Sequence, residues 1–199
     1  MSKNNRWIFI IGLLVGLAVV AALALPQLRT YTFHATVLQS PDKAPDFELE
    51  TATGPVSLDE FEGKIVLLYF GYTFCPDVCP ATLAEISKAL DMIGKKAEDV
   101  QLIMISVDPT RDTIEMLRDY VTHFHPSFLG ATGSEEEIAT IATLYGIFFE
   151  KHEGTKASGY LVDHTATVMA IDQEGHLKLI FSYGTPAQEI AEDLDHLLN

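Results

Sequence analysis

The amino-acid sequence predicts an α/β protein in which helices flank a mixed central sheet, with one transmembrane helix before the folded domain. Three observations lead to this fold class. Strand and helix patterns alternate through the middle of the chain, the last third has the pattern of a hairpin followed by a helix, and residues 7–25 form an uncharged apolar run. The chain has 199 residues, 48% of them hydrophobic, which is enough for one domain of ordinary size plus an appendage.

The apolar run at 7–25 approaches the ~20 residues that a helix needs to cross the hydrocarbon core of a bilayer. Lys3 and Arg6 precede it, and positive charges tend to stay on the cytoplasmic side. A cleaved signal peptide is the alternative, because the small residues at 22–24 resemble a cleavage site. The run is longer than the apolar core of a typical signal peptide, and this length favours an uncleaved anchor.

These features predict four segments. Residues 1–6 form a cytoplasmic tail, residues 7–25 the anchor, residues 26–42 a polar tether and residues 43–199 the folded domain. We therefore expect a single-pass protein of the cell membrane, whose C-terminal domain lies on the outer, periplasmic or otherwise extracytoplasmic, face.

The predicted outer part of the chain is strongly acidic. The formal net charge is −15, and it becomes −18 when the cations Lys3, Arg6 and Arg29 are left out. A surface of this sign repels the phosphates of nucleic acids and of anionic lipids. We expect no nucleic-acid partner, and contact with the membrane through the anchor.

The first half of the domain alternates strands with helices. Phe47 and Leu49 alternate with acidic residues, as in a half-buried strand, and the continuous apolar run at 64–70 predicts a central strand covered on both faces. Apolar residues at helical spacing then predict a helix at 81–93, which Gly94 ends.

The second half begins with a buried strand at 100–107 and a helix at 112–124, and a capping box then predicts a further helix that starts after Ser134. The character of the sequence changes after residue 164. Two strands at 165–171 and 176–182 flank a turn, and a closing helix follows them at 186–198.

Cys75 and Cys79 are the only cysteines, and three residues separate them. Cys79 is expected at or next to the N-terminal cap of the helix at 81–93, where the backbone dipole favours thiolate. Two sulfurs at this spacing could bind a soft ion such as Cu(I) or Zn(II), form a disulfide, or do both at different times. A stabilising disulfide is the plain alternative in an exported protein, but a bridge across so short a loop removes little chain entropy.

A histidine near the two sulfurs would permit Cu(II) as well. Of the seven histidines, His164 stands out, because it follows Asp163 and precedes an apolar strand at the edge that can face the carboxyl end of the strand at 64–70. The other six are expected to be solvated or hydrogen-bonded: His34, His123, His125, His152, His176 and His196.

Three segments resemble motifs of the Sco/SenC copper chaperones, membrane-anchored thioredoxin-like proteins of cytochrome c oxidase assembly. The first is Gly-Lys-Ile-Val-Leu-Leu-Tyr-Phe-Gly-Tyr-Thr-Phe-Cys-Pro-Asp-Val-Cys-Pro at 63–80, the second Ser-Val-Asp-Pro-Thr-Arg-Asp-Thr at 106–113 and the third Tyr-Leu-Val-Asp-His-Thr at 160–165. The resemblance covers roughly residues 44–198. One departure is Ile114, where the family usually has proline in the first turn of a helix.

The resemblance implies a thioredoxin-like domain in its peroxiredoxin-like variant. It also implies that Cys75, Cys79 and His164 bind copper, as Cu(I) and as Cu(II), and that Asp77 and Asp163 modulate the site. The expected receiver is the binuclear copper site of cytochrome c oxidase subunit II. Another copper donor and a thiol reductase are further expected partners.

Two other functions stay open beside the copper carrier. The first is a membrane-anchored thiol–disulfide oxidoreductase that reduces the copper-site cysteines of the oxidase and carries no metal. The second is a peroxidase of the peroxiredoxin type, suggested by Ala-Pro-Asp-Phe at 44–47, in which Arg111 would be the cationic partner of one activated cysteine. The leading interpretation is a metal carrier and not a classical enzyme.

Overall fold

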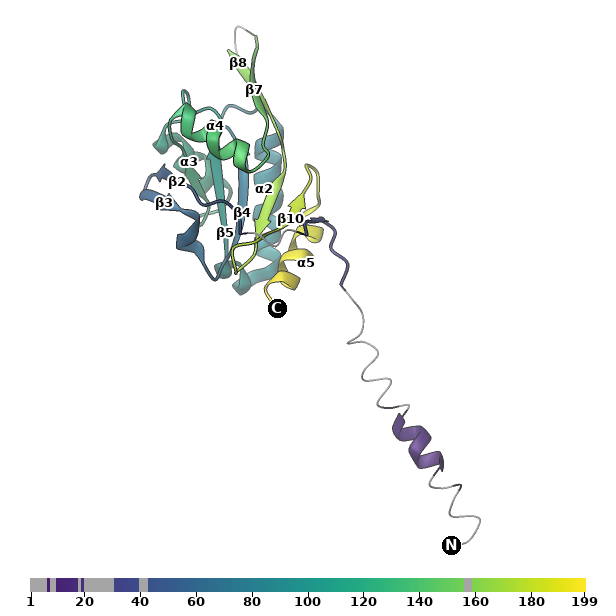
Figure 1. Ribbon diagram of the computed structural model, residues 1–199. Coiled ribbons are helices and arrows are strands. Elements are labelled where there is room, and N and C mark those ends of the chain that lie inside the picture. Colours follow the sequence, from purple (N-terminus) through teal and green to yellow (C-terminus); the bar gives the residue numbers. More distant parts are fainter. Residues whose placement is uncertain (1–6, 8–9, 18, 20–30, 40–42, 156–158) are drawn as a thin grey trace. The chain divides into compact units, whose positions relative to one another are not determined.

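The computed structural model describes residues 7, 10–17, 19, 31–39, 43–155 and 159–199 (Figure 1). It divides into two units, 1–32 and 33–199. In the first unit the described residues between 7 and 19 are helical and exposed. Within the described residues, no helix combines the length and the apolar character that crossing a membrane requires. Much of the predicted anchor, and all of the predicted tail, lie outside the described residues.

A six-stranded mixed sheet forms the centre of the second unit, as predicted. Along the sheet the strands are β1 (Thr36–Val37), β10 (Leu177–Phe181), β9 (Val168–Ile171), β4 (Ile65–Gly71), β5 (Val100–Ser106) and β6 (Leu129–Ala131). β4, β5 and β6 run parallel, whereas β9 is antiparallel to both β4 and β10. Every residue of β4 is buried, which confirms the expectation of a strand covered on both faces.

Helices cover both faces of this sheet (Figure 1). They are α2 (Val78–Ile93), α3 (Ile114–Phe124), α4 (Glu135–Leu144) and α5 (Ala187–Leu197). α2 packs against α3 and α5. Neighbouring residues of β4 point to opposite faces: the Tyr69 ring lies on the side of Gly71 where the α2 residue Cys79 also lies, whereas the Phe70 ring packs 6.0 Å from the ring of Tyr145 at the end of α4. The predicted capping box is present, because Ser134 and Glu137 bond reciprocally at the start of α4.

Two hairpins lie outside the central sheet. One joins β2 (Glu48–Thr51) to β3 (Gly54–Ser57), and the other joins β7 (Phe149–Glu153) to β8 (Tyr160–His164). Figure 1 shows the second hairpin projecting from the body of the unit. Short 3₁₀ helices at Leu58–Phe61 and Gly94–Asp99 complete the described elements of this unit. The strand predicted at 165–171 therefore starts later, at Val168, and His164 ends a separate strand.

The compact unit begins at Phe33, earlier than the boundary at residue 43 drawn from the sequence. β1 pairs with β10, and the buried carboxylate of Asp193 accepts the backbone N–H groups of His34 at 3.1 Å and Ala35 at 2.8 Å. A strand of two residues shows no hydrophobic alternation, so the sequence pattern could not reveal it. Part of the predicted tether thus belongs to the sheet.

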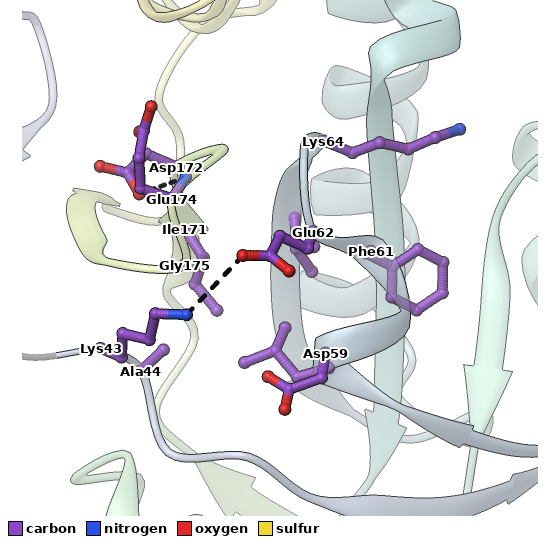
Figure 2. Close-up of a pocket in the computed structure, with 12 residues that line it drawn as sticks. Lys43, Ala44, Asp59, Phe61, Glu62, Lys64, Ile171, Asp172, Glu174 and Gly175 are labelled. Carbon is purple, nitrogen blue, oxygen red and sulfur yellow. Dashed lines mark hydrogen bonds and ion pairs between the residues drawn. The ribbon is translucent and has the colours of Figure 1, made fainter.

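Lys43 and Ala44 line a small pocket, shown in Figure 2. Ala44 donates its N–H to the Gly175 carbonyl at 2.7 Å, and Lys43 lies 3.9 Å from the Glu62 carboxylate. Lys64 and other lining residues lie at the amino end of β4. The cysteines follow the carboxyl end of the same strand, so this pocket and the cysteine pair are at opposite ends of the sheet.

Candidate metal centre

The two cysteines are positioned by the connection from β4 to α2. β4 ends at Gly71, a loop carries Cys75, and Cys79 is the second residue of α2. Pro80 follows within the first helical turn, where its missing N–H has no carbonyl to bond. The helix thus begins at Val78, earlier than the predicted 81, and Cys79 lies in its first turn, two residues after the N-cap Asp77.

Gly71 lets the Cys79 sulfur lie against the end of the strand. A Cβ at this position would stand 2.8 Å from Tyr69 Cε1, 3.1 Å from Cys79 Sγ and 3.1 Å from Met104 Cε. Real Cβ atoms are not found as close as the first of these distances, because the atoms would overlap. Sequence reasoning did not single out this glycine, although it lies within the first motif.

His164 reaches the cysteines from the end of β8. Its Nε2 lies 3.4 Å from Cys79 Sγ, and its Nδ1 lies 3.3 Å from the carbonyl oxygen of Thr165. Nε2 is therefore the ring nitrogen that faces the sulfurs, and the carbonyl oxygen can accept a hydrogen bond from a protonated Nδ1. The imidazole meets the rings of Tyr69 and Tyr72 edge-on, at 6.1 and 5.9 Å between centroids, and these contacts limit its rotation.

The three side chains predicted as ligands therefore come together. One ligand atom from each of Cys75, Cys79 and His164 lies within 4.8 Å of the other two, and this is the metal-suited group found in the described part of the chain. Cys79 is fully buried, whereas Cys75 is partly exposed. A cleft open to solvent runs past Cys75, Asp77 and Asp163, so that a partner protein can reach the site from one side.

The two thiols differ strongly in acidity. The pKa of Cys75 is lowered to about 3, chiefly by a hydrogen bond with Cys79 and further by His164 and by the backbone N–H groups of Asp77 and Cys79. The Cys75 thiolate and burial together raise the pKa of Cys79. The pair shares one proton, with Cys75 as thiolate and Cys79 as thiol.

This assignment differs from the simple dipole argument, which favours thiolate at Cys79. Cys79 is completely buried, and burial disfavours its charged form. Cys75 receives the benefit of the helix N-terminus instead, because the Cys79 N–H points to its sulfur at 3.4 Å.

The two acidic residues expected to modulate the site lie beside it. Asp77 is the N-cap residue of α2, without a side-chain capping bond, and its backbone N–H acts on Cys75. Asp163 precedes His164 in β8 and therefore points to the opposite face of the hairpin, where its carboxylate lies 3.1 Å from His152 Nε2. Their modulating role stays a prediction.

All six of the other histidines have interactions away from the sulfurs. His34 pairs with Glu192, His152 with Asp163 and His176 with Asp172, while His125 bonds Ser127 and His123 packs on Phe124. His196 packs on Phe33. These contacts agree with the expectation that His164 differs from the rest.

Sequence reasoning missed the role of a buried carboxylate in the second motif. Asp112 accepts hydrogen bonds from Thr73 N at 3.1 Å, Thr73 Oγ1 at 2.5 Å and Ser106 Oγ at 2.6 Å. Thr73 belongs to the loop that carries Cys75, and Asp112 therefore holds this loop to the end of β5. The signal available in the sequence was the resemblance of segment 106–113.

A second buried carboxylate, that of Asp108, holds the β7–β8 hairpin, which carries His164. It accepts from the Tyr160 hydroxyl at 2.6 Å and from Arg111 Nε. Arg111 also donates to the Tyr160 carbonyl at 2.9 Å, and its guanidinium carbon lies 3.6 Å from the Tyr160 ring centroid and 4.8 Å from that of Phe74. Arg111 thus links β8 to the loop that carries Cys75. These contacts give Arg111 a structural role, and they do not favour the peroxidase interpretation, in which Arg111 would be the cationic partner of an activated cysteine.

A model of the family described as SCO1/SenC matches residues 35–199. This chain belongs to the SCO1/SenC family. A SCO2-like protein of Rickettsia felis is 34% identical over 151 residues, which cover 75% of this chain and 74% of that protein. A SCO2-like protein of Rickettsia prowazekii is 31% identical over 197 residues, or 96% of each chain.

Solved structures of SCO1/SenC proteins have the same fold. Apo Sco1 from Thermus thermophilus is 43% identical, with a TM-score of 0.76 over 84% of this chain and 98% of that one. ScoI of Bradyrhizobium japonicum with copper bound is 38% identical, with a TM-score of 0.71 over 78% of this chain and 99% of that one. The thioredoxin-like α/β fold is confirmed, whereas its peroxiredoxin-like variant stays a prediction.

Proposed function

We propose that this SCO1/SenC protein carries copper, held by Cys75 Sγ, Cys79 Sγ and His164 Nε2, to the binuclear copper site of cytochrome c oxidase subunit II. The observation that carries the proposal is the convergence of these three ligand atoms to within 4.8 Å. Two thiolates and an imidazole are soft and borderline donors, a set that suits Cu(I) and accommodates Cu(II). The copper found in the related ScoI of Bradyrhizobium japonicum supports the proposal.

The geometry suits transfer better than storage. Cu(I) is stable with two or three soft ligands, so a partner's sulfur can add before a ligand of this site leaves. The partly exposed Cys75 lies on the open side of the cleft, while Cys79 is buried beneath it. A partner would therefore approach copper from the Cys75 side, and the release of copper begins with exchange at this sulfur.

Copper binding by alanine variants of the full chain tests the ligand set. Cys75→Ala, Cys79→Ala and His164→Ala are each expected to weaken Cu(I) binding by at least about tenfold, because each removes a ligand. His176→Ala is the matched control, since His176 pairs with Asp172 at the other end of the domain. Competition with a chromophoric Cu(I) chelator measures the affinities. Wild-type affinity in all three ligand variants would end this proposal.

The topology completes the proposal: residues 1–6 in the cytoplasm, 7–25 as an anchor in the cell membrane, the following residues up to 32 as a tether, and the compact unit 33–199 on the outer face. The uncharged run and the preceding Lys3 and Arg6 support it. A copper donor and a thiol reductase would act on the outer face as well. Membrane-impermeant thiol reagents applied to intact cells test this topology, because they should label Cys75 without cell lysis.

A thiol–disulfide oxidoreductase is the second candidate, and the unequal acidity of the pair favours it. The partly exposed Cys75 thiolate would attack a disulfide of the partner and release one partner thiolate. Cys79, after losing its proton, would then attack Cys75 and release the second thiolate, so the partner gains two electrons and this pair forms a disulfide. Disulfide reduction that survives His164→Ala, together with lost copper binding, would favour this candidate.

A further inference from the structure

An apolar cleft lies next to the proposed copper site. It has a volume of about 150 Å³ and is formed by the first half of α2, the start of β9, the end of β10 and the helix α5. Buried Ile86, Val168, Phe181 and Ile190 line it, together with Tyr183, which is 50% exposed. A space of this size among apolar side chains holds a group as large as benzene. The cleft can therefore take one leucine or phenylalanine side chain.

This apolar cleft joins the cleft that runs past Cys75. Half-buried Ala166 lines both of them and lies in the connection between β8 and β9, two positions after His164. Within the described residues, the backbone N–H and C=O groups of Ala166 form no hydrogen bond with the protein. The two clefts thus form one groove, hereafter the Ala166 groove, with unpaired backbone groups where they meet.

The Ala166 groove is acidic. The described residues that line it include three carboxylates, those of Asp77, Glu85 and Asp163, and no lysine or arginine. Glu85 is paired with Lys88 at 2.6 Å, whereas Asp77 and Asp163 are exposed beside the proposed ligands. A surface of this charge attracts lysine and arginine side chains of a partner and disfavours acidic ones.

We propose that the Ala166 groove binds an extended segment of the protein that receives copper. One large apolar side chain of this segment occupies the cleft between α2 and α5, and a lysine or arginine lies beside Asp77 and Asp163. The unpaired backbone of Ala166 suits an extended segment, because such a segment presents its own N–H and C=O groups for main-chain pairing. This inference rests on the proposed copper transfer and deepens it by naming the chemistry that recognises the receiver.

Docking in this groove brings the receiver to the open side of the site. Partly exposed Cys75 lines one part of the groove, whereas none of the three proposed ligands lines the apolar cleft. Contacts in the apolar cleft therefore act on the encounter with the receiver and leave the binding of copper unchanged. Mutations there separate copper transfer from copper binding.

Two variants change the apolar cleft, and a third is the matched control. Ser182→Trp fills the cleft, while Tyr183→Ala removes part of its apolar wall, and both residues are exposed in the connection from β10 to α5. Ala139→Trp places the same large side chain in another apolar cleft, of about 360 Å³, between α4 and β7. That cleft shares no lining residue with the Ala166 groove.

The test follows Cu(I) transfer from the loaded full chain to the copper-free soluble domain of cytochrome c oxidase subunit II, by the copper content of the two proteins separated at successive times. Ser182→Trp and Tyr183→Ala are each expected to lower the second-order rate constant by about tenfold, since an anchoring side chain loses its pocket. Both should keep the wild-type Cu(I) affinity, and Ala139→Trp should keep affinity and rate. The wild-type rate should fall as salt is raised, because ions screen the charge of the groove.

Wild-type rates in both Ser182→Trp and Tyr183→Ala would overturn this inference and leave the proposed function intact. A wild-type rate that is independent of salt, or a loss of rate matched by an equal loss of Cu(I) affinity, would do the same. A wild type that binds copper and passes none to the domain would overturn the proposed receiver and this inference together. If urea unfolding shows that Ser182→Trp is poorly folded, Tyr183→Ala decides the matter, because truncation of an exposed side chain needs no repacking.

Discussion

Cys75 and Cys79 lie four positions apart, yet the pKa of Cys75 is lowered whereas that of Cys79 is raised. The spacing and the following helix were readable from the sequence, and they predicted that the pair is a site, which the fold places beside His164. Which cysteine is the thiolate could not be read there, because the dipole argument concerns Cys79 alone. The full burial of Cys79 and the N–H groups directed at Cys75 decide it, and both depend on the folded loop.

Alkylation of Cys75 by iodoacetamide is expected to show this acidity. Since its pKa is lowered to about 3, the thiolate is fully formed across the working range, and the rate should be nearly constant between about pH 5 and 8. An ordinary thiol would instead react about tenfold faster per pH unit in that range. His164→Ala should raise the pKa of Cys75, because His164 is one of the groups that lower it. A wild-type rate that climbs with pH as for an ordinary thiol would contradict the assignment.

At the scale of elements, the β4–α2 connection with the two cysteines and the β7–β8 hairpin with His164 meet through contacts between residues of different sequence motifs. β4 and α2 were predictable, because an apolar run and a helical period are local patterns. The β7–β8 hairpin was not, since both strands are short, β7 is mostly exposed, and β8 is mostly half-buried without a regular alternation. His164 was chosen for its place before a strand, and the fold brings it to Cys79 through the Asp108, Arg111 and Tyr160 contacts.

Tyr160→Phe tests whether these contacts hold the hairpin in place. The change removes the hydroxyl that bonds Asp108 at 2.6 Å, and a hydrogen bond to a charged group contributes about 1.5–3 kcal/mol. We expect faster amide hydrogen exchange in β8 and several-fold weaker copper binding, because His164 would be less well placed. Tyr183→Phe, at an exposed tyrosine, is the control. Unchanged exchange in β8 would show that the hairpin is held by other contacts.

At the scale of the whole molecule, the end of the predicted tether is part of the fold. Its pairing partner β10 and the buried Asp193 lie near the other end of the chain, so the contacts span the full length of the domain. Hydrophobic pattern reports local structure and cannot report a short edge strand whose contacts are this distant. The boundary at residue 43 reflects that limit, because the compact unit begins at Phe33.

Two shortened chains distinguish the boundaries, one that begins at Phe33 and one that begins at Lys43. Loss of residues 33–42 removes the N–H groups of His34 and Ala35 from the Asp193 carboxylate and uncovers the edge of β10. A buried carboxylate that loses charge-assisted hydrogen bonds is costly, so the free energy of unfolding in urea should fall by about 3 kcal/mol. The bare edge should also increase self-association, which sedimentation can measure. Equal stability of the two chains would place the boundary at residue 43 after all, with Phe33–Leu38 as a tether that merely rests against the sheet.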